Sequence, residues 1–140
     1  MAGTMDEGHA QRFRTEVSEN GLEDVVQVFG RIPGTDALQL INRSHLALVL
    51  AQDQAMQVPA KIYEGVAMGV LTLVIAEPSS AAAREARRVG AVTCGAEDHE
   101  AIVTLLERIS ASRLPASPSG AAIGYQDIAR QMEEVLCRTP

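Results

Sequence analysis

Three short apolar runs alternate with amphipathic segments through the middle of the chain. Residues 46–51 and 71–76 are apolar at almost every position, and residues 91–94 form a shorter run. Strands whose two faces are both buried have this pattern, which is typical of parallel sheets. A fourth run at residues 25–29 is rich in valine, ends at Gly30 and also predicts a strand.

Helical periodicity fills the intervals between these runs. We expect helices at residues 9–20, 36–42, from Pro59 onwards, 80–90, 98–110 and 122–137. The last two carry inward faces at Ile102, Leu105, Leu106 and Ile109, and at Ile128, Met132, Val135 and Leu136. Asp36 and Gln39 resemble a capping box. The alternation predicts an α/β fold with a Rossmann-like, mainly parallel sheet of about four strands and helices on both faces.

The expected domain organisation is simple. Residues 1–8 are polar and predict a flexible tail, and residues 9–112 predict a partial Rossmann-like domain. Residues 113–120 are rich in serine and proline and predict a linker, and residues 121–140 predict a C-terminal helix.

Composition excludes several classes of function. The formal charge of -6 argues against binding of nucleic acid, which requires clustered basic residues. Two isolated cysteines fit a reducing cytoplasm, and no secretory signal or membrane-spanning run is visible. Cys94 is expected to be a small buried apolar residue. The three histidines lack metal-ligand spacing, and neither a metal nor a cofactor is expected.

The segment from Val58 to Gly69, between the two longest apolar runs, carries the candidate chemistry. Pro59 suits the first turn of a helix, where unpaired amides and the helix dipole can bind a phosphate. Glu64, one turn later, could accept hydrogen bonds from the hydroxyls of a ribose. The alternative is an ordinary crossover helix with a solvent-facing glutamate. The loops at residues 31–36, 52–61, 77–80 and 95–98 are expected at the carboxyl edge of the sheet, where such folds bind ligands.

The order of motifs resembles the C-terminal lobe of two-lobed (GT-B) retaining glycosyltransferases of the group 1, family 4 type. The run Val28-Phe29-Gly30-Arg31-Ile32-Pro33 is similar to that family's strand-and-loop motif. The run Pro59-Ala60-Lys61-Ile62-Tyr63-Glu64, followed by Ala67 and Gly69, is similar to its P-x-K-x-x-E-x-x-A-x-G motif, and residues 125–136 resemble its closing helix.

This resemblance implies a lobe that binds a nucleotide-diphosphate sugar, either a UDP-sugar or a GDP-sugar. By resemblance, Arg31 and Ile32 would meet the base, and Glu64 would hold the ribose hydroxyls. The amides of the turn would face the diphosphate and the sugar; the turn comprises Val58, Pro59, Ala60, Lys61 and Ile62. From the residues alone, Lys61 fits a diphosphate contact and a solvated side chain equally well, Arg31 fits a plain loop arginine better than a ligand contact, and Glu77 is expected at the rim.

The chain departs from the family pattern in ways that bear on activity. Met56 stands where many members carry a second glutamate, and Leu71 stands where they carry a proline. The basic pair that neutralises the diphosphate and the N-terminal acceptor lobe have no counterpart, so the lobe is expected to be truncated and inactive alone. Catalytic residues are therefore not assigned. An acceptor lobe or partner chain and self-association through an exposed sheet edge are expected, and peripheral membrane association of the full enzyme is left open.

Three classes of function remain open at this stage. The chain is a donor-binding part of a glycosyltransferase, the donor-binding subunit of a two-chain enzyme, or a non-enzymatic α/β regulatory domain. The sequence specifies neither the nucleotide, the sugar, the acceptor nor the oligomeric state.

Overall fold

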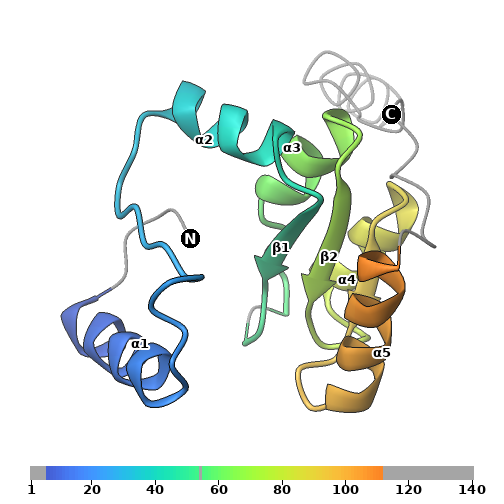
Figure 1. Ribbon diagram of the computed structural model, residues 1–140. Coiled ribbons are helices and arrows are strands. Elements are labelled where there is room, and N and C mark those ends of the chain that lie inside the picture. The colour runs from blue at the N-terminus through green and yellow to red at the C-terminus, as the bar shows by residue number, and fades with distance from the viewer. Residues whose placement is uncertain (1–5, 54, 112–140) are drawn as a thin grey trace, which may run out of the picture. The chain divides into compact units, whose positions relative to one another are not determined.

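The structure is a computed structural model that describes residues 6–53 and 55–111. Contacts divide the chain into two compact units, Met1–Leu40 and Ile41–Pro140. Along the chain the elements are α1 (Glu7–Glu19), α2 (Gly34–Asn42), β1 (Leu46–Leu50), α3 (Lys61–Ala67), β2 (Leu71–Ile75), α4 (Ala81–Arg88), β3 (Val92–Cys94) and α5 (His99–Ser110) (Figure 1). The expected linker at residues 113–120 and the helix expected after it lie outside the described residues.

The second unit contains an open parallel sheet of three strands in the order β1-β2-β3. Leu46 pairs with Leu71 at the start of β1, and Leu73 pairs with Val92 at the start of β3. The α/β class and a parallel sheet are therefore confirmed, with each apolar run of residues 46–94 forming a strand. Successive strands are joined by α3 and α4, which is the crossover expected between parallel neighbours.

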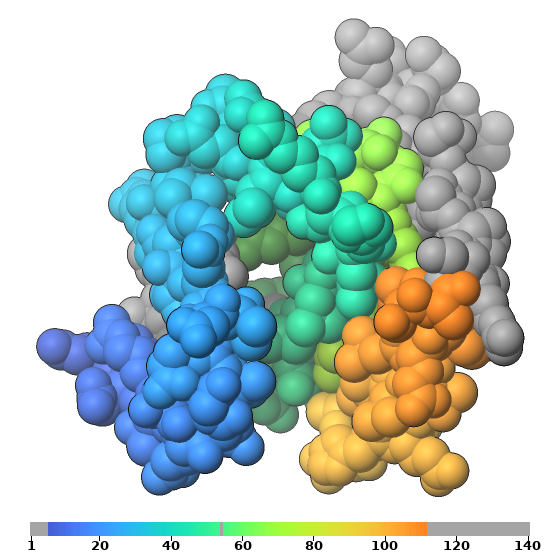
Figure 2. Space-filling view, viewed as in Figure 1, coloured from blue at the N-terminus to red at the C-terminus, as the bar shows by residue number. Residues whose placement is uncertain are grey.

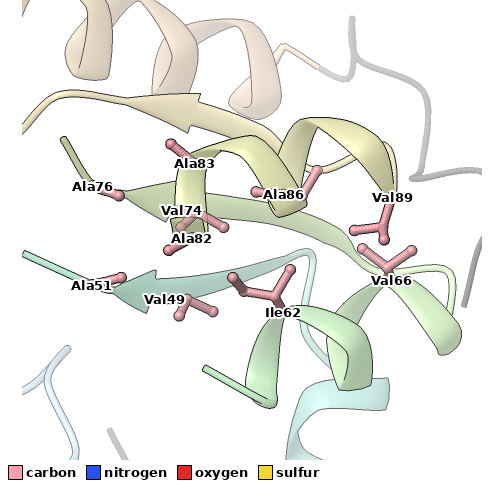
Figure 3. Packing of buried hydrophobic residues seen from close by; sticks show 11 residues of the cluster. Val49, Ala51, Ile62, Val66, Val74, Ala76, Ala82, Ala83, Ala86 and Val89 are labelled. Atoms are coloured by element: carbon pink, nitrogen blue, oxygen red, sulfur yellow. The ribbon is translucent and has the colours of Figure 1, made fainter. Parts of the chain in front are cut away.

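The two faces of this sheet carry different helices. On one face, α3 and α4 pack against β1 and β2, and their small and β-branched side chains converge (Figure 3). The buried residues of that cluster are Val49, Ala51, Ile62, Val66, Val74, Ala76, Ala82, Ala83, Ala86, Val89 and Ala91. On the other face, α5 places Leu105 against Leu73 and Ile75. Alanines dominate α4, which lets the helix backbone approach the sheet closely.

A Schellman motif ends α3. The amide of Gly69 donates to the carbonyl of Val66 at 3.0 Å, and the amide of Val70 donates to that of Gly65 at 3.0 Å. Gly69 has a φ of 70°, the left-handed conformation that this motif needs and that glycine adopts without strain. The chain then enters β2 directly, so this motif fixes where the second strand begins.

The first unit corrects one sequence prediction. Residues 25–29 do not form a strand; Val25 lies in a turn in which its amide donates to the carbonyl of Leu22 at 3.1 Å. Val25, Val28 and Phe29 are exposed, and only Gly30 makes an isolated bridge. A run of high β-propensity becomes a strand only where a neighbouring strand pairs with it. All the buried hydrophobic residues that the structure describes lie between Val49 and Leu105.

Helix boundaries and faces differ from expectation in smaller ways. Helix α1 begins at Glu7, within the expected tail, because Asp6 accepts the amide of His9 as an N-cap. Helix α2 begins before Asp36, whose amide donates to the carbonyl of Pro33, so the expected capping box is not formed. Leu106 is exposed rather than inward. No helix among the described residues is long and apolar enough to cross a bilayer.

Strand β1 differs from the expected strand that is covered on both faces. Val49 is buried beneath α3, but Leu48 and Leu50, on the other face, are 56% and 59% exposed. On that face Leu46, at the start of β1, packs against the cluster of Leu73, Ile75 and Leu105, whereas Leu48 and Leu50 are left uncovered.

Candidate functional site

The segment that starts α3 follows the carboxyl end of β1, and α3 joins β1 to β2. Pro59 precedes the helix, which begins at Lys61, and the carbonyl of Pro59 accepts the amide of Ile62 at 3.1 Å. The carbonyl of Ala60 accepts the amides of Tyr63 and Glu64. Internal bonds thus occupy three of the amides in this first turn, including that of Ile62.

Two amides of the turn remain available. Within the described residues, the amides of Ala60 and Lys61 have no hydrogen-bond acceptor, and both residues are exposed. Val58 and Pro59 are half-buried, and the side chain of Ile62 is fully buried in the core. The sequence therefore located the turn correctly, but the side chains of Val58 and Ile62 serve packing.

Glu64 is the acidic side chain of this segment, and it lines neither the groove beside β3 nor the cavity after β1 and β2. Its side chain is half-buried on α3, and across residues 6–53 and 55–111 its carboxylate makes neither a hydrogen bond nor an ion pair. A partly desolvated carboxylate without a partner retains its capacity to accept hydrogen bonds from a ligand. The next residue, Gly65, lies against the sheet, so packing fixes the rotation of α3 and hence the direction in which Glu64 leaves the helix.

Arg31 and Ile32 belong to the first unit. Arg31 is exposed in the bend that follows Gly30, which has a φ of 63°, and Ile32 is half-buried in the connection to α2. The structure describes them within that unit, and their expected role toward a base stays a prediction.

A second feature of the carboxyl edge involves Glu77, which the sequence placed at the rim, and Asp53, which was not singled out. The Glu77 carboxylate, just after β2, accepts the amide of Asp53 at 3.0 Å, and this bond lowers the pKa of Glu77. The amide of Ala81 donates to the carbonyl of Ala55 at 2.8 Å. These two bonds tie the loop after β1 to the loop after β2, and Asp53 adopts a left-handed φ of 58°.

The two loops joined by these hydrogen bonds line a solvent-open cavity of about 390 Å³. Its lining residues are Asp53, Ala55, Glu77, Ser79 and Ser80. The hydroxyl oxygen of Ser80 caps α4 by accepting the amide of Ala83 at 3.1 Å. The signal that could have located this cavity was the position of Asp53 and Glu77 directly after two parallel strands.

Two arginines of α4 brace the loop that follows β2. Arg84 donates to the carbonyl of Ser79 at 2.7 Å, and Arg87 donates to the carbonyl of Pro78 at 3.0 Å. Guanidinium groups that bind carbonyls hold a loop in one conformation while keeping their charge at the surface. This bracing places positive charge beside the carboxyl edge of the sheet.

A hydrogen-bonded cluster links α3 to α4. The Tyr63 hydroxyl donates to the Glu85 carboxylate at 2.7 Å, and Arg88 Nε donates to the same carboxylate at 2.7 Å. The bonds from Arg88, more than that from Tyr63, hold the pKa of Glu85 below its ordinary value, while partial burial raises the pKa of Tyr63. The cluster keeps the two helices in register on the sheet.

Other reactive groups are not gathered into a site. Cys94 is half-buried at the end of β3, where burial raises the pKa of its thiol, so the thiolate is disfavoured. In the part of the chain that the structure describes, no three His, Cys, Asp or Glu side chains lie together as metal ligands would.

Comparisons of this chain with protein-family models, with curated proteins and with solved structures find no match.

Proposed function

We propose that this chain is the nucleotide-sugar-binding part of a retaining glycosyltransferase with a Rossmann-like lobe. One observation carries the proposal: the segment with the P-x-K-x-x-E pattern forms the turn and helix between two parallel strands. There the Glu64 carboxylate is partly buried without a partner among the described residues, and it lies within one helical turn in sequence of the available amides of Ala60 and Lys61. Two amides and a carboxylate suit a diphosphate and a ribose diol respectively.

The proposed role is confined to the donor substrate. Glycosyl transfer requires the donor, the acceptor and stabilisation of the leaving group in one cleft. The chain supplies donor contacts, and an acceptor lobe, joined or on another chain, supplies the rest. A donor-binding subunit of a two-chain enzyme uses the same residues in the same way, so both readings share the substrate class.

Calorimetric titration of the full chain with UDP and, separately, with GDP tests the proposal. Saturable binding of one diphosphate, with weaker binding of the corresponding monophosphate, is the expected result. A chain that binds neither diphosphate is not a donor-binding lobe, and the non-enzymatic α/β domain then becomes the better description.

A further inference from the structure

The outer edge of β1 carries backbone groups that no other described strand of the sheet reaches. Within the described residues β1 pairs with β2 alone, because the strand order is β1-β2-β3. The amide of Ala51 donates to the carbonyl of Ile75 at 2.9 Å, so the backbone groups of Ala51 point toward β2. This direction alternates along a strand, and the N–H and C=O groups of Leu46, Leu48 and Leu50 therefore point to the outer edge.

The same three leucines place their side chains on one face of β1. Val49 lies on the opposite face, where it is buried in the cluster beneath α3 and α4. Leu46 packs against the cluster beneath α5, whereas Leu48 and Leu50 are 56% and 59% exposed. In Figure 2 the blue-green surface of β1 is visible on the near side of the second unit. An apolar strand with an unpaired edge is a template for pairing with a strand of another chain.

Opposite charges flank β1 at equal distances in sequence from its centre. Arg43 lies five positions before Leu48, and Asp53 lies five positions after it. Both side chains are exposed, and neither forms a hydrogen bond or an ion pair with another described residue. The bond between Asp53 and Glu77 uses the amide of Asp53 and leaves the Asp53 carboxylate available. The two ends of this edge are therefore complementary in charge.

We propose that two copies of this chain pair through β1 in antiparallel orientation, with Leu48 of one copy opposite Leu48 of the other. In this register Leu46 lies opposite Leu50 of the second copy. All three leucines point their backbone groups to the outer edge, so each opposite pair exchanges two hydrogen bonds. The leucines of both copies lie on the same face of the joined sheet, where opposite side chains contact each other. This proposal is independent of the proposed function.

Charge and backbone direction together select this arrangement. The antiparallel pair brings Arg43 of each copy to the end at which Asp53 of the other copy lies, whereas a parallel pair would bring like charges together. A register centred on a residue other than Leu48 pairs fewer of the outward backbone groups and moves the opposite charges apart. The two-fold symmetry is that of an ordinary homodimer, in which both copies contribute the same surface.

The dimer is expected to be weak. Each strand contributes five residues, which make a small interface, and small interfaces belong to the transient class. The formal charge of -6 on each chain also opposes association. Association should therefore be visible at high protein concentration and should reverse on dilution.

Sedimentation velocity of the full chain, over about a hundredfold range of concentration, measures this association. The variant Leu48→Lys places like charges directly opposite each other and should raise the Kd of the dimer by about tenfold or more. The matched control is Val103→Lys, which should leave the Kd unchanged, because Val103 is 55% exposed on α5 and lies outside the pairing edge. A chain that is monomeric at every concentration, or a dimer that Leu48→Lys does not weaken, would overturn the proposal.

Disulfide formation tests the register. In a chain carrying Cys94→Ala and Cys137→Ser, the variant Leu48→Cys should form a disulfide-linked dimer under mild oxidation, because α-carbons that are opposite in such a pair lie about 5.5 Å apart. The variant Met56→Cys measures random collision, since Met56 is 82% exposed, and should remain largely monomeric. Equal yields of linked dimer from these two variants would contradict the pairing of β1 with itself.

Two further variants in the same background test the orientation. Leu46→Cys alone should not link to itself, because the two copies of this position lie about four residues, or roughly 14 Å, apart along the pair. A mixture of Leu46→Cys and Leu50→Cys chains should link, because these positions are opposite. Self-linking by Leu46→Cys as efficient as that by Leu48→Cys would show a different arrangement and rule out the proposed one.

Exchange of the flanking charges provides a test that does not alter the strand. Arg43→Glu and Asp53→Lys should each weaken self-association, since each variant leaves like charges at both ends of the pair. An equimolar mixture of the two variants should recover the dimer, because each altered end then meets an opposite charge. A mixture that associates no better than the separate variants would be inconsistent with the proposal.

Discussion

Gly65 of α3 lies so close to Thr72 of β2 that a β-carbon at position 65 would stand 2.3 Å from the Thr72 hydroxyl oxygen. The same atom would lie 3.3 Å from the β-carbon of Ala47 on β1. Thr72 is fully buried, and its hydroxyl donates to the carbonyl of Val70 at 3.0 Å. The close approach of α3 to both strands therefore depends on the absence of a side chain at this position.

Gly65→Ala should destabilise the protein by about 1–3 kcal/mol, the usual cost of overpacking a core. The better helix propensity of alanine, worth about 1 kcal/mol, offsets only part of this cost. Urea denaturation of the variant and of Gly95→Ala, where nothing lies within 4 Å of the added carbon, checks the prediction. The double variant with Thr72→Ala should recover part of the lost stability. Equal midpoints for both single variants would mean that α3 does not approach the sheet this closely.

Gly69→Ala should also destabilise the chain, for a reason unrelated to space. Its φ of 70° costs an L-residue roughly 1–2 kcal/mol, and the Schellman motif that joins α3 to β2 requires this conformation. Urea denaturation measures the loss. Gly69→Asn should be milder, since asparagine tolerates the left-handed region better than alanine, and an alanine variant as stable as the wild type would refute the assignment.

The cluster of Tyr63, Glu85 and Arg88 predicts a pH dependence. The pKa of Glu85 is held below its ordinary value of 4.5, chiefly by Arg88. Its contribution to stability is therefore fully present above that value and is lost as the pH falls through the lower pKa of the folded state. The stability difference between the wild type and Glu85→Gln, measured by urea denaturation, should be constant from about pH 7 down to about pH 5 and shrink below about pH 4.

Tyr63→Phe isolates the hydroxyl of this cluster. Removal of its hydrogen bond to Glu85 should cost about 0.5–1.5 kcal/mol, because the ring of Tyr63 still packs against the core. Urea denaturation near neutral pH measures this cost. In a Glu85→Gln background the same substitution should cost less, and an unchanged cost would show that the two side chains are not coupled.

Glu64→Ala should weaken binding of a nucleoside diphosphate by about 1.5–3 kcal/mol, or about tenfold to 150-fold in Kd, through the loss of charge-assisted hydrogen bonds. Calorimetric titration measures it. Glu107→Ala, an exposed glutamate of α5, is the matched control and should leave Kd unchanged. Affinity that survives Glu64→Ala while the chain still binds the diphosphate would remove Glu64 from the proposed site.

The three strands of the sheet could be predicted from the sequence because each is an apolar run between clear turn signals. The same reasoning was wrong for residues 25–29, where no feature of the run itself reveals whether a neighbouring strand is available. The open face of β1 was missed for a related reason. Leu48 and Leu50 have the sequence pattern of a strand covered on both faces, and only the structure shows that the cluster beneath α5 includes Leu46 but neither of these two residues.

The turn at Pro59 was located from the sequence, but its hydrogen bonds were not. Proline signals a helix start, whereas the division between occupied and available amides depends on the local winding at Ala60. The bond between Asp53 and Glu77 joins residues 24 positions apart and depends on the register of β1 with β2. The spacing of the strands in the sequence predicts that these two loops lie at one edge of the sheet, but it does not predict which of their atoms form a hydrogen bond.

The order of strands in the sheet is the order of strands in the chain, and this has a consequence for how the second unit is made. Leu46 pairs with Leu71, which lies 25 positions later in the sequence, and Leu73 pairs with Val92, which lies 19 positions after Leu73. Each strand can therefore dock as soon as it leaves the ribosome, with no wait for a distant segment to emerge. A parallel sheet usually folds slowly because its pairings are remote in sequence, and here the loops to be closed are as short as crossover helices allow.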